Sequence, residues 1–187
     1  MPRVPDRLPM PEEAALTDDQ RAARDLISSG PRGGIMGPFI PLLRAPELMT
    51  RVQRVGEYLR FDGTLDPDLR ELVVLDTAQR CQNAFEWEFH LPIALDCGLP
   101  ESVVRELVQG RALTSGRPEI RVLWALLDEL HRDADVSDAT YSAATALLDE
   151  RQLVEAVACS GYYTMLAMVM NMARTPAPAD ADAEHTR

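Results

Sequence analysis

The ten residues CQNAFEWEFH, at positions 81–90, place one of the chain's three histidines close to two glutamates. On a helix, Glu86 and His90 are four residues apart and therefore lie on one face. A histidine titrates near neutral pH, and a neighbouring carboxylate can fix its tautomer and stabilise its charged form. Together the two side chains can move a proton onto or off a substrate carbon.

Two other interpretations of this pair remain open. One is an ordinary salt bridge between residues four apart on an exposed helix face. The other is a shared metal ion, but a catalytic zinc site needs at least a third protein ligand. Because neither His131 nor His185 stands where it offers that ligand, we expect no metal site.

The surrounding residues predict a narrow polar stripe on an otherwise apolar helix. Asn83 lies one turn before Glu86 on the same face, and Cys97 lies two turns after His90. The other faces carry bulky apolar groups at Phe85, Trp87, Phe89 and Leu91. Pro92 removes one backbone hydrogen bond and tends to kink the helix beside His90.

A second carboxylate of interest is Glu71, within the apolar run LRELVVL. It is either a partly exposed residue on a helix edge or a group that faces a cavity. In a cavity, burial would raise its pKa and suit it to proton transfer.

Composition predicts that helices position these groups. The 187-residue chain is 46% apolar but only 5% aromatic, with Leu, Ala, Val and Met dominant, which favours helices over strands. We expect one all-α domain over residues 17–174, after an extended arm at 1–16 and before a disordered tail at 175–187. Amphipathic or capped segments predict helices at 17–30, 46–61, 66–82, 83–98, 99–110, 117–133, 137–150 and 151–174.

Three local signals support these helices. Thr17 and Gln20 stand at capping-box spacing, and Asp66 is the expected N-cap of the helix at 66–82. The helix at 46–61 should have one apolar face, formed by Leu48, Val52, Val55 and Leu59.

Two segments predict additional packing. Residues 31–46 are rich in Gly and Pro and should be irregular, yet they carry six large apolar side chains, so we expect them to pack against the body. The last helix is apolar nearly all round from Ala156 to Met172, which is typical of a helix buried in a bundle or an oligomer interface.

Charge and cysteine content exclude several classes of protein. A net charge of −11 argues against nucleic-acid binding and against docking on anionic membranes. No apolar run reaches transmembrane length, and residues 1–16 lack the apolar core of a signal peptide. Three cysteines without metal-site spacing indicate reduced thiols, so we expect a cytoplasmic protein.

The strings LRELVVLDTAQR and EWEFHLPIALDCGLPESVV resemble the carboxymuconolactone decarboxylase family of the alkylhydroperoxidase-D-like superfamily. Upstream and downstream blocks in the family order extend the resemblance over residues 37–173. The resemblance implies an all-α, alkylhydroperoxidase-D-like helical bundle that forms homotrimers or homohexamers, with its site near a subunit interface.

The resemblance also separates two kinds of chemistry. The superfamily's peroxidases use CxxCxxxH with a preceding glutamate, which falls on Glu71, and the histidine falls on His90. The two thiol positions fall on Asn83 and Glu86, and Cys81 and Cys97 lie too far apart to replace them, so we expect no dithiol peroxide reduction. The decarboxylase branch carries EWxxH, as here, although Phe85 stands where that branch often has a tyrosine.

We therefore expect a cofactor-free decarboxylase that acts on a small carboxylated lactone or related carbonyl compound. In this hypothesis His90 delivers or shuttles the proton, Glu86 orients it and Glu71 supports the network. The predicted substrate contacts are Arg44, Arg60, Asn83 and Trp87, with the two arginines either holding the substrate carboxylate or lying at the surface. The alternatives are a hydroperoxidase-like redox protein and a non-catalytic oligomer that binds a small molecule.

Overall fold

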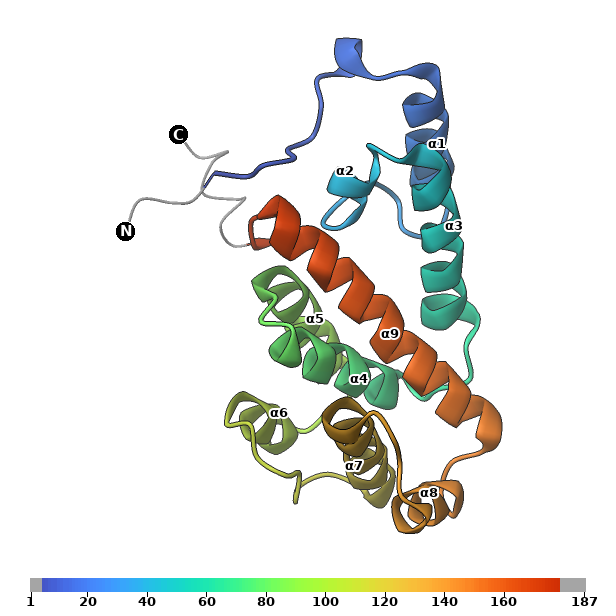
Figure 1. Cartoon of the computed structure of the whole chain (residues 1–187), viewed down its shortest axis with the longest axis vertical. Helices are drawn as coiled ribbons and strands as arrows, with labels where there is room; N and C mark the ends of the chain where they lie inside the picture. The colour runs from blue at the N-terminus through green and yellow to red at the C-terminus, as the bar shows by residue number, and fades with distance from the viewer. Residues whose placement is uncertain (1–4, 179–187) are drawn as a thin grey trace.

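The computed structural model describes residues 5–178, which fold into helices without any strand (Figure 1). Residues 1–4 of the predicted arm and 179–187 of the predicted tail lie outside the described residues. The helices, in chain order, are η1 (Glu13–Ala15), α1 (Asp18–Ser29), α2 (Phe39–Leu42), α3 (Pro46–Glu57), η2 (Tyr58–Asp62), α4 (Pro67–Arg80), α5 (Ala84–Asp96), α6 (Glu101–Val108), α7 (Pro118–Asp133), α8 (Asp138–Thr145) and α9 (Glu150–Ala173). The predicted all-α fold is confirmed.

Helix α4 lies at the centre of the protein and packs against α5, α7 and α9. Its run from Leu72 to Leu75 is completely buried, which explains why the sequence is apolar on every side there. Pro67 occupies the first turn, where no backbone donor is needed. The predicted cap, Asp66, makes no capping hydrogen bond, because its carboxylate pairs with Arg117 instead.

Helix α9 runs diagonally across the molecule, with α1 and α3 on one side and the α4–α5 pair on the other (Figure 1). A capping box between Asp149 and Gln152 begins the helix. At 24 residues, α9 is long and apolar enough to cross a membrane, contrary to our expectation that no such segment occurs. However, more than half of its most apolar window is buried inside the protein, as in the core helix of a globular fold.

The predicted apolar face of α3 is only partly the buried one. Val52 is buried as expected, but Leu48 and Val55 are about half exposed. The helix instead turns Met49 and Gly56 inward, because α3 is held between α1 and α9. Leu48 and Val55 therefore form part of an outer apolar surface.

The segment before α3 is packed, as expected, but it is not wholly irregular. Pro38 precedes the one-turn helix α2, whose Phe39 and Leu42 are buried together with Leu43. Part of the predicted arm also touches the body, since the amide of Arg7 donates to the carbonyl of Ala173 at 2.7 Å.

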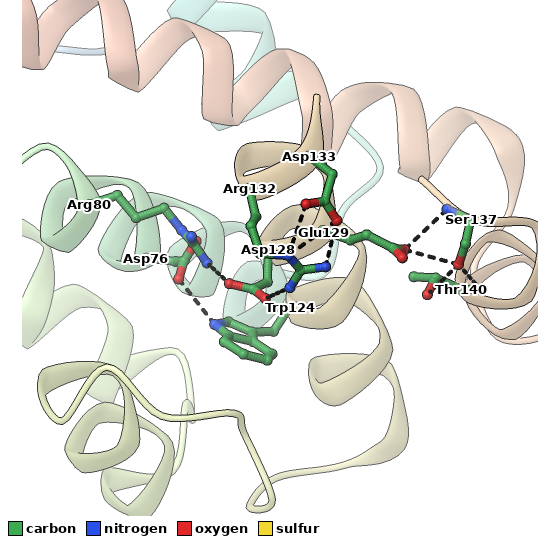
Figure 2. A network of polar contacts seen from close by, with 9 residues as sticks. All are labelled: Asp76, Arg80, Trp124, Asp128, Glu129, Arg132, Asp133, Ser137 and Thr140. Atoms are coloured by element: carbon green, nitrogen blue, oxygen red, sulfur yellow. Dashed lines mark hydrogen bonds and ion pairs between the residues drawn. The ribbon is translucent and has the colours of Figure 1, made fainter. Parts of the chain in front are cut away.

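A polar network joins α4 to α7 (Figure 2). The buried Asp76 accepts hydrogen bonds from Arg80 at 2.7 Å and from the Trp124 indole at 3.1 Å. Arg80 also pairs with Asp128 at 3.0 Å. Burial raises the pKa of Asp76 even though Arg80 opposes it. Along α7, Glu129 accepts a hydrogen bond from the backbone amide of Ser137, the N-cap of α8. Helix α8 ends at Thr145, five residues before the predicted end.

The crossing of α3 and α9 depends on the absence of a side chain at Gly56. A methyl group there would overlap the Tyr162 hydroxyl and the Arg32 guanidinium. Ala normally stabilises a helix interior relative to Gly, but here we expect Gly56→Ala to lower the free energy of unfolding by about 1–3 kcal/mol. Urea denaturation measures this change.

The matched control is Gly34→Ala, where a methyl group meets no atom within 4 Å and the backbone is compatible with alanine. We expect this variant to match the unaltered protein or to gain up to about 1 kcal/mol. Equal stability of the two variants would contradict the packing described for Gly56.

Candidate active site

A small cavity of about 30 Å³ lies between α5, α9, η2 and the segment from residue 32 to 39. This volume is enough for roughly one or two water molecules. A wider hollow of about 160 Å³ adjoins it. The two spaces share the lining residues Arg32, Met36, Phe39, Arg60 and Phe89.

Helix α5 aims Glu86 and His90 into the cavity, and both side chains are buried. The helix begins at Asn83, whose side-chain oxygen accepts the Glu86 amide hydrogen at 2.9 Å. The Asn83 amide nitrogen donates to Asn171 of α9 at 2.8 Å. This cap fixes the start of α5 against α9 and therefore sets the direction in which Glu86 and His90 point.

Glu71 of α4 contacts His90 on the side away from the cavity. The His90 Nδ1 lies 2.7 Å from Glu71 Oε2, and both side chains are nearly inaccessible to solvent. The second Glu71 oxygen accepts from Arg70 Nε at 3.2 Å. Arg70 also donates to the carbonyl of Arg60 at 3.1 Å, which ties this ion pair to η2. Glu71 is thus not an exposed residue at a helix edge.

The other imidazole nitrogen faces Glu86. His90 Nε2 lies 3.4 Å from Glu86 Oε2, on the side that meets the cavity. With Nδ1–H donated to Glu71, a neutral imidazole would turn its Nε2 lone pair toward a carboxylate oxygen. A proton between Nε2 and Oε2 removes this repulsion. The arrangement therefore favours a protonated His90 Nε2 at the wall of the cavity.

The electrostatics of the pair favour a charged imidazole. Burial lowers the pKa of His90, but the hydrogen bonds to Glu71 and Glu86 outweigh it, so the pKa is raised above its usual 6.5. Burial raises the pKa of Glu71, but His90 and Arg70 outweigh it, so this pKa is lowered. The sequence-based expectation of a raised Glu71 pKa is wrong, because the cation beside the carboxylate was not foreseen.

Aromatic rings complete the environment of His90. The Tyr163 ring meets the imidazole edge-on, with centroids 5.2 Å apart, and Phe89 does so at 5.2 Å. Burial raises the pKa of the Tyr162 hydroxyl to about 12, so it is a neutral donor at neutral pH. These rings shield the ion pair from bulk water.

Four of the seven predicted site residues lie together at the cavity, and the other three do not line it. His90, Glu86 and Arg60 line the cavity, and Glu71 lies directly behind His90. Asn83 acts as the helix cap, and Trp87 packs on the core without lining either space. Arg44 is exposed and donates to the carbonyls of Ile40 and Pro9.

Sequence reasoning missed three lining residues, Arg32, Tyr162 and Tyr163. Arg32 lies in the Gly- and Pro-rich segment, where no period indicates which way a side chain points. The two tyrosines belong to the nearly uniform apolar run of α9. Their one available signal was that they are hydroxyl-bearing residues inside a helix expected to be buried.

The thiols do not form a dithiol site. Cys81, Cys97 and Cys159 are all free. Cys159 is buried, and burial raises its pKa to about 12, which leaves it unreactive. Within residues 5–178 no group of three or more His, Cys, Asp or Glu side chains is placed to hold a metal ion.

Comparison with known families agrees with the resemblance. Residues 46–129, which include Glu71, Glu86 and His90, match the model of the carboxymuconolactone decarboxylase family. No curated protein matches the sequence.

Solved structures with a similar fold include an uncharacterised peroxidase-related protein of Ralstonia eutropha, described as an alkylhydroperoxidase AhpD core. It has a TM-score of 0.75 and 19% identity, with 94% of each chain covered. A putative antioxidant defence protein AhpD of Agrobacterium tumefaciens has a TM-score of 0.65 and 18% identity, over 73% of this chain and 94% of that one. A peroxidase-related protein of Silicibacter has a TM-score of 0.71 and 13% identity, over 94% and 93%. At these identities the likeness establishes the fold alone.

The ion pair predicts the titration of His90. Because Glu71 stabilises the imidazolium, we expect His90 to titrate above pH 6.5 and Glu71→Gln to move that midpoint downward. Nitrogen-15 NMR of the imidazole measures both midpoints. The control Glu47→Gln, at an exposed carboxylate of α3 paired with Arg51, should leave the midpoint unchanged. A His90 midpoint that is the same in the unaltered protein and in Glu71→Gln would contradict the coupling.

Proposed function

We propose that this protein, whose residues 46–129 match the model of the carboxymuconolactone decarboxylase family, is a cofactor-independent lyase that removes CO₂ from a small carboxylated lactone or related carbonyl compound. The observation that supports this most is the buried His90, held between Glu71 and Glu86 at the wall of a cavity. A proton donor shielded from water is what the second half of such a reaction needs.

The reaction divides into two steps. The bond between the substrate carbon and its carboxylate breaks, CO₂ leaves, and the electron pair of that bond delocalises into the adjacent carbonyl system. His90, as imidazolium, then gives a proton to carbon, directly or through Glu86, and later regains one from solvent. Glu71 does not line the cavity, so it acts as a positioning residue that fixes the imidazole and supports its charge.

The carboxylate of the substrate needs a cation, and Arg60 is our candidate. It lines both the inner cavity and the wider hollow. Its guanidinium lies 5.6 Å from the Phe61 ring centroid and 5.8 Å from that of Phe89, so aromatic faces hold it in place. Arg44, the other sequence candidate, is not part of this proposal, because it lies outside both spaces.

A hydroperoxidase is the less favoured alternative. The names of the structural neighbours point toward peroxidase chemistry. Here, however, a dithiol peroxidase would need cysteines at positions occupied by Asn83 and Glu86, and both of these side chains have other roles. A non-catalytic binding protein would keep the cavity without needing a charged His90.

The lyase proposal predicts that the purified protein releases CO₂ from carboxymuconolactone. A coupled assay that detects CO₂ measures this activity. We expect His90→Gln to lower kcat by about 10²–10⁴, the usual contribution of a general acid or base. We also expect kcat to fall as pH rises through the raised pKa of His90, because the imidazolium is lost. Glu71→Gln should shift this alkaline limb to lower pH.

The matched control is His131→Gln, since His131 contacts Ser160 outside the cavity and should keep nearly full activity. Unchanged turnover in His90→Gln would eliminate the assigned role of His90. Consumption of an organic peroxide driven by a thiol reductant, without CO₂ release, would favour the hydroperoxidase alternative.

We also propose that the protein is cytoplasmic.

We further propose that α9 packs against other copies of the chain. The outer face of this helix carries a stripe of exposed apolar side chains, namely Val154, Val157, Met165, Met168 and Met172. Beside Val154 lie apolar hollows of about 740 and 450 Å³, and the exposed Val55 of α3 lines the second. Such a continuous apolar surface is characteristic of an interface.

Sedimentation equilibrium tests this assembly. We expect the unaltered protein to be a trimer or hexamer and Val154→Glu to dissociate it at micromolar concentration, because a charge would be buried. Glu101→Gln, at an exposed position of α6, should leave the mass unchanged. A monomeric unaltered protein at high concentration would contradict the proposal.

A further inference from the structure

Three buried polar atoms around the cavity have no hydrogen-bond partner among residues 5–178. They are Arg32 Nε, Tyr162 Oη and Glu86 Oε1. Buried polar groups in folded proteins are almost always hydrogen-bonded, and leaving one unpaired costs about 1–3 kcal/mol. Unpaired atoms from three different segments around one cavity indicate that a ligand completes their hydrogen bonding.

Arg32 and Tyr162 approach the same place. Both come close to Gly56, whose lack of a side chain leaves room for the hydroxyl and the guanidinium together. The Arg32 guanidinium lies over the Phe39 ring, 4.9 Å from its centroid, so its position is restrained. The two groups therefore present donors from one wall, and Glu86 presents an acceptor from α5.

The charges favour an anion at this wall. Within the described part of the chain, neither Arg32 nor Arg60 forms an ion pair with a carboxylate. Nine of the seventeen arginines among residues 5–178 do have such partners there, including Arg70, Arg80 and Arg117. Arg32 and Arg60 therefore bring two guanidinium groups without a carboxylate partner among these residues to the lining of one hollow.

We infer that Arg32 and Tyr162 form an oxyanion-binding pair that binds the ligand carboxylate together with Arg60 and selects small planar organic acids carrying a hydrogen-bond donor on the side facing Glu86. The inference rests on the proposed function only in taking the cavity beside His90 as the substrate site. Arg32 donates through Nε–H, Tyr162 donates through its hydroxyl, and Glu86 Oε1 accepts from the donor of the ligand.

The shape of the site supports a flat ligand. Phe39, Phe61 and Phe89 line the wider hollow, so aromatic rings border the space that would hold the body of the ligand. The inner cavity of about 30 Å³ is too small for a whole organic acid, whereas the adjoining hollow of about 160 Å³ has room for a ring. The acid therefore lies across both spaces, with its body in the hollow.

Isothermal titration calorimetry with 4-hydroxybenzoate and its methyl ester tests the inference. The acid carries both the carboxylate and the donor, and the ester lacks only the charge. We expect the acid to bind the unaltered protein and Arg32→Gln to weaken it about 10- to 100-fold, the usual effect of losing a charged hydrogen bond. Tyr162→Phe, which keeps the ring, should weaken the acid by a smaller factor, and neither change should affect the ester more than about twofold.

The control is Arg44→Gln, which removes an arginine outside both spaces and should bind the acid normally. Arg32→Lys, which keeps the charge but loses Nε–H, should fall between Arg32→Gln and the unaltered protein. Equal loss of acid and ester, or no acid binding to the unaltered protein up to about 10 mM, would overturn the inference. If binding of the acid depends on Arg32 but no CO₂ is released from carboxymuconolactone, the inference is retained and the lyase proposal is rejected. If carboxymuconolactone is turned over but Arg32→Gln does not weaken binding of the acid, the lyase proposal is retained and the inference is rejected.

Discussion

The site depends on one buried ion pair, between His90 Nδ1 and Glu71 Oε2, 2.7 Å apart. Burying either charge alone would be costly, and removing one partner would leave the other uncompensated. Together, with Arg70 on the far oxygen of Glu71, they form a satisfied network inside an apolar core. Because α4 and α5 each supply one partner, the pair fixes how these two helices meet.

The remaining structure holds this pair in place and keeps water away from it. Asn83 attaches the start of α5 to α9, so Glu86 and His90 face the cavity rather than the solvent. Gly56 lets α3 approach α9 closely enough for Tyr162 to close one side. The Asp76 network holds α4 against α7 (Figure 2). The contacts that hold these helices together therefore also position the side chains of the site.

The sequence predicted most helices because caps and periodicity are local signals, as in the capping box of Thr17 and Gln20. It also predicted that Glu86 and His90 share a face, which follows from helical spacing. It could not predict that Leu48 and Val55 point outward, because that depends on where α1 and α9 lie. Arg32 escaped notice for the same reason, since a loop residue reaches a site only through tertiary structure.

The central claim is that His90 delivers a proton to carbon inside the cavity that it lines. The most direct test is the decarboxylation of carboxymuconolactone in D₂O, with NMR analysis of the carbon that receives the proton. We predict that the unaltered protein places deuterium on a single face of that carbon, because a fixed donor approaches from one side. Equal deuterium on both faces would mean protonation by solvent after release, and would contradict the account.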